Sequence, residues 1–139
     1  MRTNKMSRIT SISLIYDVKV DGHYGEFDGF EVKTEVDSYK VLIENGQSCC
    51  ESWGYFDTND NKDDFLGAML LDVRTTDTIL NSKRLETLEV SVEISECMFV
   101  DFITNRGTFQ LAVYNSHNGY YGHSVLLLKN NDHVIDSGL

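Results

Sequence analysis

Apolar and polar residues alternate with a period of two along much of this chain, a pattern typical of β-strands that bury one face. The alternation predicts a first strand over residues 9–16, followed by a hairpin whose strands span residues 30–36 and 39–44. Residues 17–29 contain three glycines and four acids, which indicates an irregular connection or the tip of a hairpin. The N-terminal part of the chain is therefore expected to be mostly β-structure.

The C-terminal third shows the clearest strand pattern. Four β runs are expected there, over residues 88–95, 97–104, 108–115 and 123–129. Glycine-bearing polar turns, at residues 105–107 and 117–119, lie at two of the joints between these runs. The arrangement predicts an antiparallel meander.

One helical signal lies in residues 61–68, where Asn61 and neighbouring acids precede a short apolar stretch that a glycine interrupts. Residues 69–73 are expected to form a buried strand, and residues 74–84 a polar loop. Together these elements predict a single domain over residues 1–139, of the α+β class. Its main feature would be a mostly antiparallel β-sheet or small barrel, a meander of hairpins with one or two short helices.

The charge balance restricts the partners of the protein. The chain has 22 Asp and Glu residues against 12 Lys and Arg residues, a net charge of −10, so binding to nucleic-acid phosphates is not expected. No apolar run approaches the roughly 20 residues that span a bilayer, and the N-terminal stretch is too short for a secretory signal. Three cysteines without spaced pairs fit a reducing compartment. We expect a cytoplasmic protein that contacts neither nucleic acid nor membrane directly.

The adjacent cysteines Cys49 and Cys50 suggest chemistry, but their spacing argues against it. Neighbouring residues of an extended segment point to opposite faces, so both thiols do not readily bind one tetrahedral ion. A zinc site would need distant partners such as Cys97, His117 or His123, and the sequence places no base beside either cysteine. We therefore expect small packed residues here, with neither a bound metal nor a cofactor.

An acidic segment follows, and it begins like a calcium-binding loop of the EF-hand type. After the opening D-x-N-x-N pattern, Lys62 replaces the glycine of position six and Ala68 replaces the glutamate of position twelve. A solvated acidic loop that caps the short helix is the favoured interpretation, with weak calcium binding as the alternative. The candidate residues for contact with a protein partner are Asp57, Asp60, Asp63 and Asp64.

Residues 114–124 gather two amides, two imidazoles, two hydroxyls and three phenols around a glycine-bearing turn. Such a set is suited to stacking an aromatic base and hydrogen bonding its polar edges; the alternative is an ordinary hairpin turn whose tyrosines cover the sheet rim. Three arginines are candidate phosphate contacts. The expected ligand-binding residues are Asn115, His117, Asn118, Tyr120, Tyr121, Arg74, Arg84 and Arg106.

The familiar signatures of catalysis are absent from the sequence. It contains no G-x-S-x-G, G-x-G-x-x-G or H-E-x-x-H motif and no phosphate-binding P-loop. Its acids are numerous, but no pair is set apart by apolar surroundings as catalytic carboxylates are. A non-enzymatic binding protein is therefore expected.

Two blocks of the sequence resemble a known family. The first covers residues 39–51 and ends in C-C-E; the second begins with D-F-L-G-A at residues 64–68 and continues with N-G-Y-Y at residues 118–121. This order resembles the DUF7448 family of small uncharacterised proteins, common in bacteriophage genomes. In that family Asp often precedes the two cysteines, where this chain has Ser48.

The resemblance implies a phage protein that acts against bacterial defence in the host cytoplasm. One hypothesis is a homo-oligomeric sponge that sequesters a nucleotide-derived immune signal, a cyclic ADP-ribose isomer or cyclic oligonucleotide, as the Thoeris anti-defence proteins do. A second is an acidic anti-CRISPR inhibitor that binds a Cas nuclease and blocks its nucleic-acid channel. A third is a metal-binding protein of unknown activity, centred on the cysteines. The partner would be a small nucleotide signal or a host defence protein.

Overall fold

The computed structural model describes residues 6–46, 51–57, 61–81, 83–88, 92–117 and 122–139. These residues form nine β-strands and three very short helices. The strands are β1 (Ser7–Lys19), β2 (Glu26–Thr34), β3 (Ser38–Glu44), β4 (Glu51–Asp57), β5 (Met69–Thr76), β6 (Cys97–Thr104), β7 (Gly107–His117), β8 (Ser124–Lys129) and β9 (Asp132–Gly138). The helices are η1 (Lys62–Phe65), α1 (Lys83–Glu86) and η2 (Ile94–Glu96).

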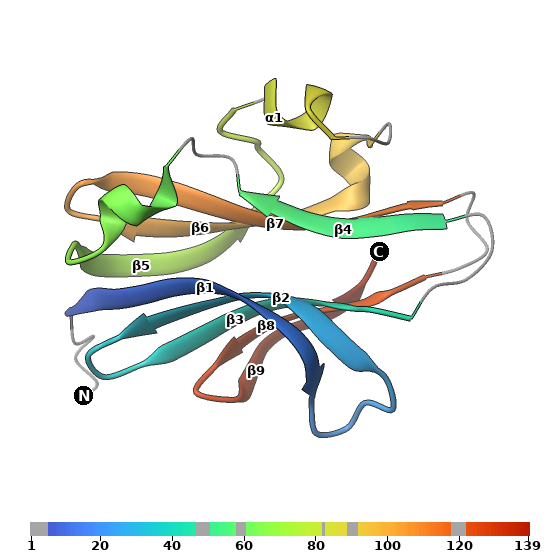
Figure 1. Ribbon diagram of the computed structural model, residues 1–139, viewed down its shortest axis with the longest axis horizontal. Helices are drawn as coiled ribbons and strands as arrows, with labels where there is room; N and C mark the ends of the chain where they lie inside the picture. Colours follow the sequence, from blue (N-terminus) through green and yellow to red (C-terminus); the bar gives the residue numbers. More distant parts are fainter. Residues whose placement is uncertain (1–5, 47–50, 58–60, 82, 89–91, 118–121) are drawn as a thin grey trace.

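All nine strands belong to one antiparallel sheet with the order β4-β7-β6-β5-β1-β2-β3-β8-β9. The sheet bends sharply at the seam between β5 and β1, which are joined only by the pairs Ser7–Leu70 and Arg8–Met69. Figure 1 shows the result: the four-stranded layer β4-β7-β6-β5 lies over the five-stranded layer β1-β2-β3-β8-β9. The outermost strands β4 and β9 do not pair with each other, so the sheet is open.

The main hydrophobic core fills the space between the two layers. The five-stranded layer contributes inward-facing residues such as Phe30 and Val41, and the four-stranded layer contributes Phe102, Phe109 and Val113. The rings of Phe102 and Phe109 stack with their centroids 4.9 Å apart. Each fully buried side chain of this size contributes about 1.5–3 kcal/mol through the hydrophobic effect, so this core is the main source of stability.

Both layers also bury residues on their outer faces. On the five-stranded layer, Phe27, Leu42, Leu126 and Leu128 form a second apolar cluster, and Val20 covers it from the loop between β1 and β2. Strand β8 therefore has apolar side chains on both faces, which explains its unbroken V-L-L-L sequence.

On the four-stranded layer, the segment around α1 covers a third cluster. Leu85 and Leu88 of this segment pack on Phe56, Phe99 and Ala112. Figure 1 shows α1 above β7 on the side that faces away from the five-stranded layer.

The two layers also meet near the start of β8. Trp53 of β4 stacks on His123, with ring centroids 5.8 Å apart and an angle of 30° between the planes. The backbone of His123 exchanges two hydrogen bonds of 2.9 Å with the backbone of Leu139. Leu139 itself packs against the main core.

The structure confirms a mostly antiparallel β fold and the positions of several strands. The prediction for residues 97–104 matches β6, and the hairpin of residues 30–44 is formed by β2 and β3. The helical signal at residues 61–68 corresponds to the single turn η1, and Asn61 caps it by accepting a hydrogen bond from the Asp63 amide. The barrel alternative is wrong because the sheet is open, and helix is confined to elements of three or four residues.

Other predictions failed for local reasons. Residues 88–95 were expected to form a strand, but Leu88 and residues 92–95 lie outside any strand. There the Glu93 amide donates to the Glu96 carboxylate at 2.9 Å and closes the turn η2. Residues 69–73 belong to β5, yet only Leu70 among them is buried, because the outer side of this strand is open to solvent.

Strands β4 and β9 were not predicted. Both lie at an edge of the sheet, where a strand pairs on one side only and its sequence needs no regular apolar alternation. No helix among the described residues is long and apolar enough to cross a membrane.

Candidate functional site

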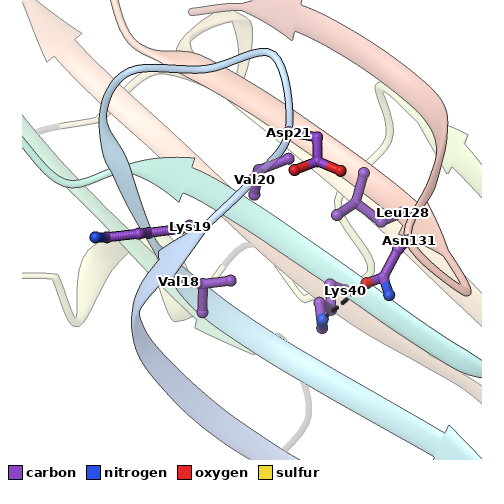
Figure 2. A pocket seen from close by; sticks show the side chains of 7 residues that line it. All are labelled: Val18, Lys19, Val20, Asp21, Lys40, Leu128 and Asn131. Atoms are coloured by element: carbon purple, nitrogen blue, oxygen red, sulfur yellow. Dashed lines mark hydrogen bonds between the residues drawn. The ribbon is translucent and has the colours of Figure 1, made fainter.

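A pocket of about 320 Å³ opens on the outer face of the five-stranded layer. This volume is at the lower end of the roughly 300–1,000 Å³ typical of small-molecule sites. The pocket is formed by the end of β1 and the loop that follows it, together with β3 and the β8–β9 hairpin; we call it the loop–hairpin pocket (Figure 2). Its lining residues are Val18, Lys19, Val20, Asp21, Lys40, Leu128 and Asn131.

The lining of this pocket is mainly polar and includes a smaller apolar wall. Val20 and Leu128 belong to the second apolar cluster, so the apolar wall is anchored in the fold. The ammonium group of Lys40 donates a hydrogen bond of 3.0 Å to the side-chain oxygen of Asn131. Figure 2 shows this bond, with the Asp21 side chain beside Val20 on the opposite side of the pocket, while the side chain of Lys19 extends away from the other lining residues. The pocket therefore offers one cation, one carboxylate and one amide beside an apolar surface.

The turn between β8 and β9 positions Asn131. It consists of Asn130 and Asn131, whose φ angles of 52° and 69° are both positive. Asparagine tolerates this left-handed conformation better than most residues, and two consecutive positive φ angles are typical of the type I′ turn of tight hairpins. The side chain of Asn130 accepts from the Ser38 amide at 2.9 Å, which ties the turn to β3.

A group of three side chains, which we call the His–Asp cluster, lies on the same loop and hairpin. His23 comes from the β1–β2 loop, and His133 and Asp136 come from β9. His23 Nε2 and His133 Nδ1 each lie 3.1 Å from the same Asp136 oxygen, Oδ2. The two imidazole rings stack with centroids 5.9 Å apart and planes 12° from parallel. One ligand atom from each residue lies within 4.8 Å of the others, a spacing at which one metal ion can contact all three.

A β-bulge brings His133 and Asp136 to one face of β9. Residues three apart on a regular strand point to opposite faces. Here Leu127 pairs with Ile135 while Leu128 pairs with His133, so β9 contains one extra residue, Val134. As a result His133 lies opposite Leu128, and Asp136 lies opposite Leu126, both on the outer face that carries the second apolar cluster.

The cluster has a defined electrostatic and apolar setting. The hydrogen bond with His23, followed by that with His133, lowers the pKa of the Asp136 carboxyl below its ordinary value of 3.8. The edge of the His23 ring packs on Phe27, with centroids 5.3 Å apart in a T-shaped arrangement. His23 thus anchors the β1–β2 loop both to the apolar cluster and to β9.

The residues expected to bind a ligand near residue 115 lie in different settings. Asn115 is fully buried, and its side-chain amide donates to the Leu139 carbonyl at 3.0 Å, so it connects β7 to the C-terminal residues. His117 is the last residue of β7. The side chain of His117 and the whole of Asn118, Tyr120 and Tyr121 lie outside the described residues, so a pocket at this turn stays a prediction.

The three arginines are engaged at separate places. Arg106 donates to the Leu66 carbonyl at 3.0 Å and holds the η1 segment, and it precedes β7, whereas Asn115 lies near the far end of that strand. Arg74 lies 3.3 Å from the Asp72 carboxylate. Arg84 donates to the Asp57 carbonyl at 2.9 Å. At about 3.3 Å per residue, Arg106 and Asn115 of one chain are roughly 30 Å apart, so they do not share one pocket.

Of the four acidic candidates, the three that the structure describes lie in different settings. The Asp57 carboxylate lies 3.5 Å from Arg84 and 3.8 Å from Lys62, so two cations neutralise it. Asp63 and Asp64 are exposed on η1, and Asp60 lies outside the described residues. The inhibitor hypothesis therefore rests on the net charge of −10 and stays a prediction.

The cysteine hypothesis is tested at one position only, because Cys49 and Cys50 lie outside the described residues. Cys97 is described and half-buried; burial, with a smaller contribution from Glu96, raises the pKa of its thiol to about 12. A thiol with such a pKa carries almost no thiolate at neutral pH, and the thiolate is the form that attacks substrates and binds metals.

Sequence patterns gave no signal for the His–Asp cluster. His23 and His133 are separated by more than a hundred positions, and only the pairing of the strands brings them together. The cluster and the loop–hairpin pocket share the β1–β2 loop and the β8–β9 hairpin. Leu128, which lines the pocket, has Lys40 as its cross-strand neighbour on one side and His133 on the other.

Comparison with known proteins places the chain in a family. Residues 8–127 match the family model described as a domain of unknown function, DUF7448. The chain belongs to the DUF7448 family. The match includes His23 and Lys40 and ends before β9, so two of the three cluster residues lie beyond it. No curated protein and no solved structure matches the chain.

Proposed function

We propose that this DUF7448 protein acts by binding a small ligand in the loop–hairpin pocket, and not by catalysis. The ligand is a nucleotide-derived signal, such as a cyclic ADP-ribose isomer or a cyclic oligonucleotide, of which the pocket holds one nucleotide unit. The observation that supports this proposal is the combination of an apolar wall with the Lys40 ammonium, the Asn131 amide and the Asp21 carboxylate in about 320 Å³.

Each part of a nucleotide has a matching group in the pocket. The base packs on the apolar wall of Val18, Val20 and Leu128, the kind of surface that lines most small-molecule sites. The ribose hydroxyls donate hydrogen bonds to the Asp21 carboxylate, as acidic residues do in dinucleotide sites. The Lys40 ammonium donates a charge-assisted hydrogen bond to a phosphate oxygen.

The biological consequence is sequestration. A protein without turnover removes a signal by holding it, so its capacity is set by its concentration and affinity. The resemblance to phage proteins and the proposed chemistry of the pocket support an anti-defence role in the host cytoplasm. A homo-oligomer would multiply the number of pockets per particle.

Native mass spectrometry of freshly purified protein is the first test, because it reports retained nucleotide and subunit number together. Calorimetry then measures binding of cyclic ADP-ribose isomers, cyclic dinucleotides and AMP by the metal-free protein. We expect Lys40→Ala and Asp21→Asn each to weaken binding by about ten-fold, the effect of losing one hydrogen bond to a charged group. Lys33→Ala is the matched control, since Lys33 is exposed on β2 and pairs with Glu31 outside the pocket.

Two results would contradict the proposal. One is the absence of heat with every probe. The other is binding that Lys40→Ala and Lys33→Ala affect equally, because the ligand would then lie elsewhere on the molecule.

A further inference from the structure

The geometry points to a metal site: His23, His133 and Asp136 bind one divalent transition-metal ion of the zinc class at the outer face of the five-stranded layer. Imidazole nitrogen and carboxylate oxygen are common ligands of zinc and its neighbours in the first transition row. The site is separate from the cysteines that the sequence brought to notice.

The spacing of the carboxylate oxygen from each imidazole nitrogen is already close to that in a site with a bound ion, and all three ligand atoms lie within 4.8 Å of one another. Bonds of about 2.0–2.1 Å at the tetrahedral angle place neighbouring ligand atoms about 3.3 Å apart. In the structure the two imidazole nitrogens each lie 3.1 Å from the same carboxylate oxygen of Asp136. Small side-chain rotations therefore suffice to admit the ion between these atoms.

The backbone holds the ligands in place from two sides. His133 and Asp136 are fixed on one face of β9 by the bulge at Val134. His23 is held by its contact with the buried ring of Phe27. Ligands held by strand pairing and by a contact with a buried ring lose less freedom when they bind than ligands on a free loop, which favours affinity.

The site is open to solvent and lies in an acidic protein. Side-chain exposure is 15% for His23 and 46% for Asp136, so an ion can enter and keep further positions for water or another ligand. The net charge of −10 attracts cations towards the surface. The Glu44 carboxylate lies beside Gly25, two residues from His23, and adds to the local negative potential.

The alternative explanation is a purely structural network in which the two imidazoles only hydrogen bond to the carboxylate. Both explanations give the same arrangement without metal. They differ in stoichiometric ion binding, in the absorption spectrum of a bound cobalt ion, and in the effect of metal on thermal stability.

The test uses the full chain with the double substitution Cys49→Ser and Cys50→Ser, freed of any histidine tag and stripped with chelator. We expect titration with zinc to saturate at one ion per chain. Cobalt(II) should give visible absorption, and zinc should raise the melting temperature because it binds the folded state only.

The variants His23→Gln, His133→Gln and Asp136→Asn should each weaken zinc binding by roughly a hundred-fold, since even residues that merely support a ligand change affinity by 10- to 100-fold. Asp132→Asn is the matched control, because Asp132 is also exposed on β9 but lies outside the cluster. Melting curves of the metal-free variants verify that they are folded.

The proposal is overturned if the stripped protein binds no zinc or cobalt. It is also overturned if the double variant His23→Gln, His133→Gln, folded as judged by its melting curve, binds as tightly as the parent protein. Neither result bears on nucleotide binding, which is measured without metal on the groups of the neighbouring pocket.

Discussion

The outer faces of the two layers are both apolar, yet they are covered in different ways. On the four-stranded layer, the segment before α1 is held by the fully buried amide of Gln110, which donates to the Thr78 carbonyl at 2.9 Å and accepts from the Leu80 amide at 3.1 Å. On the five-stranded layer, the β1–β2 loop is held by the contact between His23 and Asp136.

The difference lies in the chemistry of the anchors. An amide keeps its hydrogen bonds at every pH, whereas imidazole and carboxylate change charge with pH and bind metals. The two covers therefore differ in their anchors: a buried amide holds the first, whereas the second depends on groups that change charge and lies beside a pocket. This contrast is the reason why both proposed sites lie on the five-stranded layer.

The largest loss of stability is expected from a substitution at Gly29, where β2 and β3 approach closely beneath the β1–β2 loop. A Cβ atom at Gly29 of β2 would overlap the carbonyl oxygen of Val41 on β3, and neither backbone can move without breaking the ladder. Gly29→Ala should lower the free energy of unfolding by about 3 kcal/mol, as measured by denaturant titration. Gly46→Ala is the control, because its Cβ would meet no atom within 4 Å. Equal stability of the two variants would contradict this account.

A smaller loss is expected from removing the amide anchor. Gln110→Ala leaves the Leu80 amide and the Thr78 carbonyl without this partner and should cost about 2 kcal/mol at neutral pH. Gln110→Glu keeps the acceptor and introduces a charge beside Asp101, which the amide now contacts at 2.8 Å. Its loss of stability should therefore shrink as the pH falls and the carboxyls are protonated. A Gln110→Ala variant as stable as the parent protein would contradict this account.

The smallest loss of stability is expected from a substitution of Asp136, whose exposed carboxylate holds the β1–β2 loop through His23. Because hydrogen bonds with His23 and His133 lower the pKa of Asp136 in the folded protein, ionised Asp136 stabilises the fold above the ordinary carboxyl pKa of 3.8. This contribution is lost as the pH falls through the lowered folded value. In chelator, Asp136→Asn should melt slightly below the parent at neutral pH, and the gap should close as the pH falls below 3.8 and Asp136 becomes protonated in the folded protein. Asp132→Asn should show no such gap.

The sequence predicted strands that pair with a neighbour on both edges, and it missed β4 and β9, which pair on one edge only. Strand β6 was predicted correctly because its alternating residues are paired on both edges and it ends at a glycine-bearing turn. Strand β9 reads D-H-V-I-D-S-G and is mostly exposed, so burial imposes no pattern on it. Strand β9 forms because its backbone pairs with that of β8, and its own side-chain pattern gives no sign of this pairing.

The candidate site was the least predictable part, for a related reason. In the sequence, His117 and His123 stand out because both lie in the polar and aromatic segment of residues 114–124. The cluster instead depends on the register of β9 against β8, and one extra residue, Val134, reverses the face of every side chain beyond it. Alternation would have placed His133 and Asp136 on opposite faces. Local patterns do not encode such a bulge.

The stacking of Trp53 on His123 gives the molecule a built-in optical reporter. Trp53 is the sole tryptophan of the chain, and its ring lies where β4 of one layer meets the start of β8 of the other. Its emission in the unlabelled protein therefore follows the contact between the two layers, at a place outside both the His–Asp cluster and the loop–hairpin pocket. A change in Trp53 emission on adding metal or nucleotide would show that binding at the outer face alters the contact between the two layers.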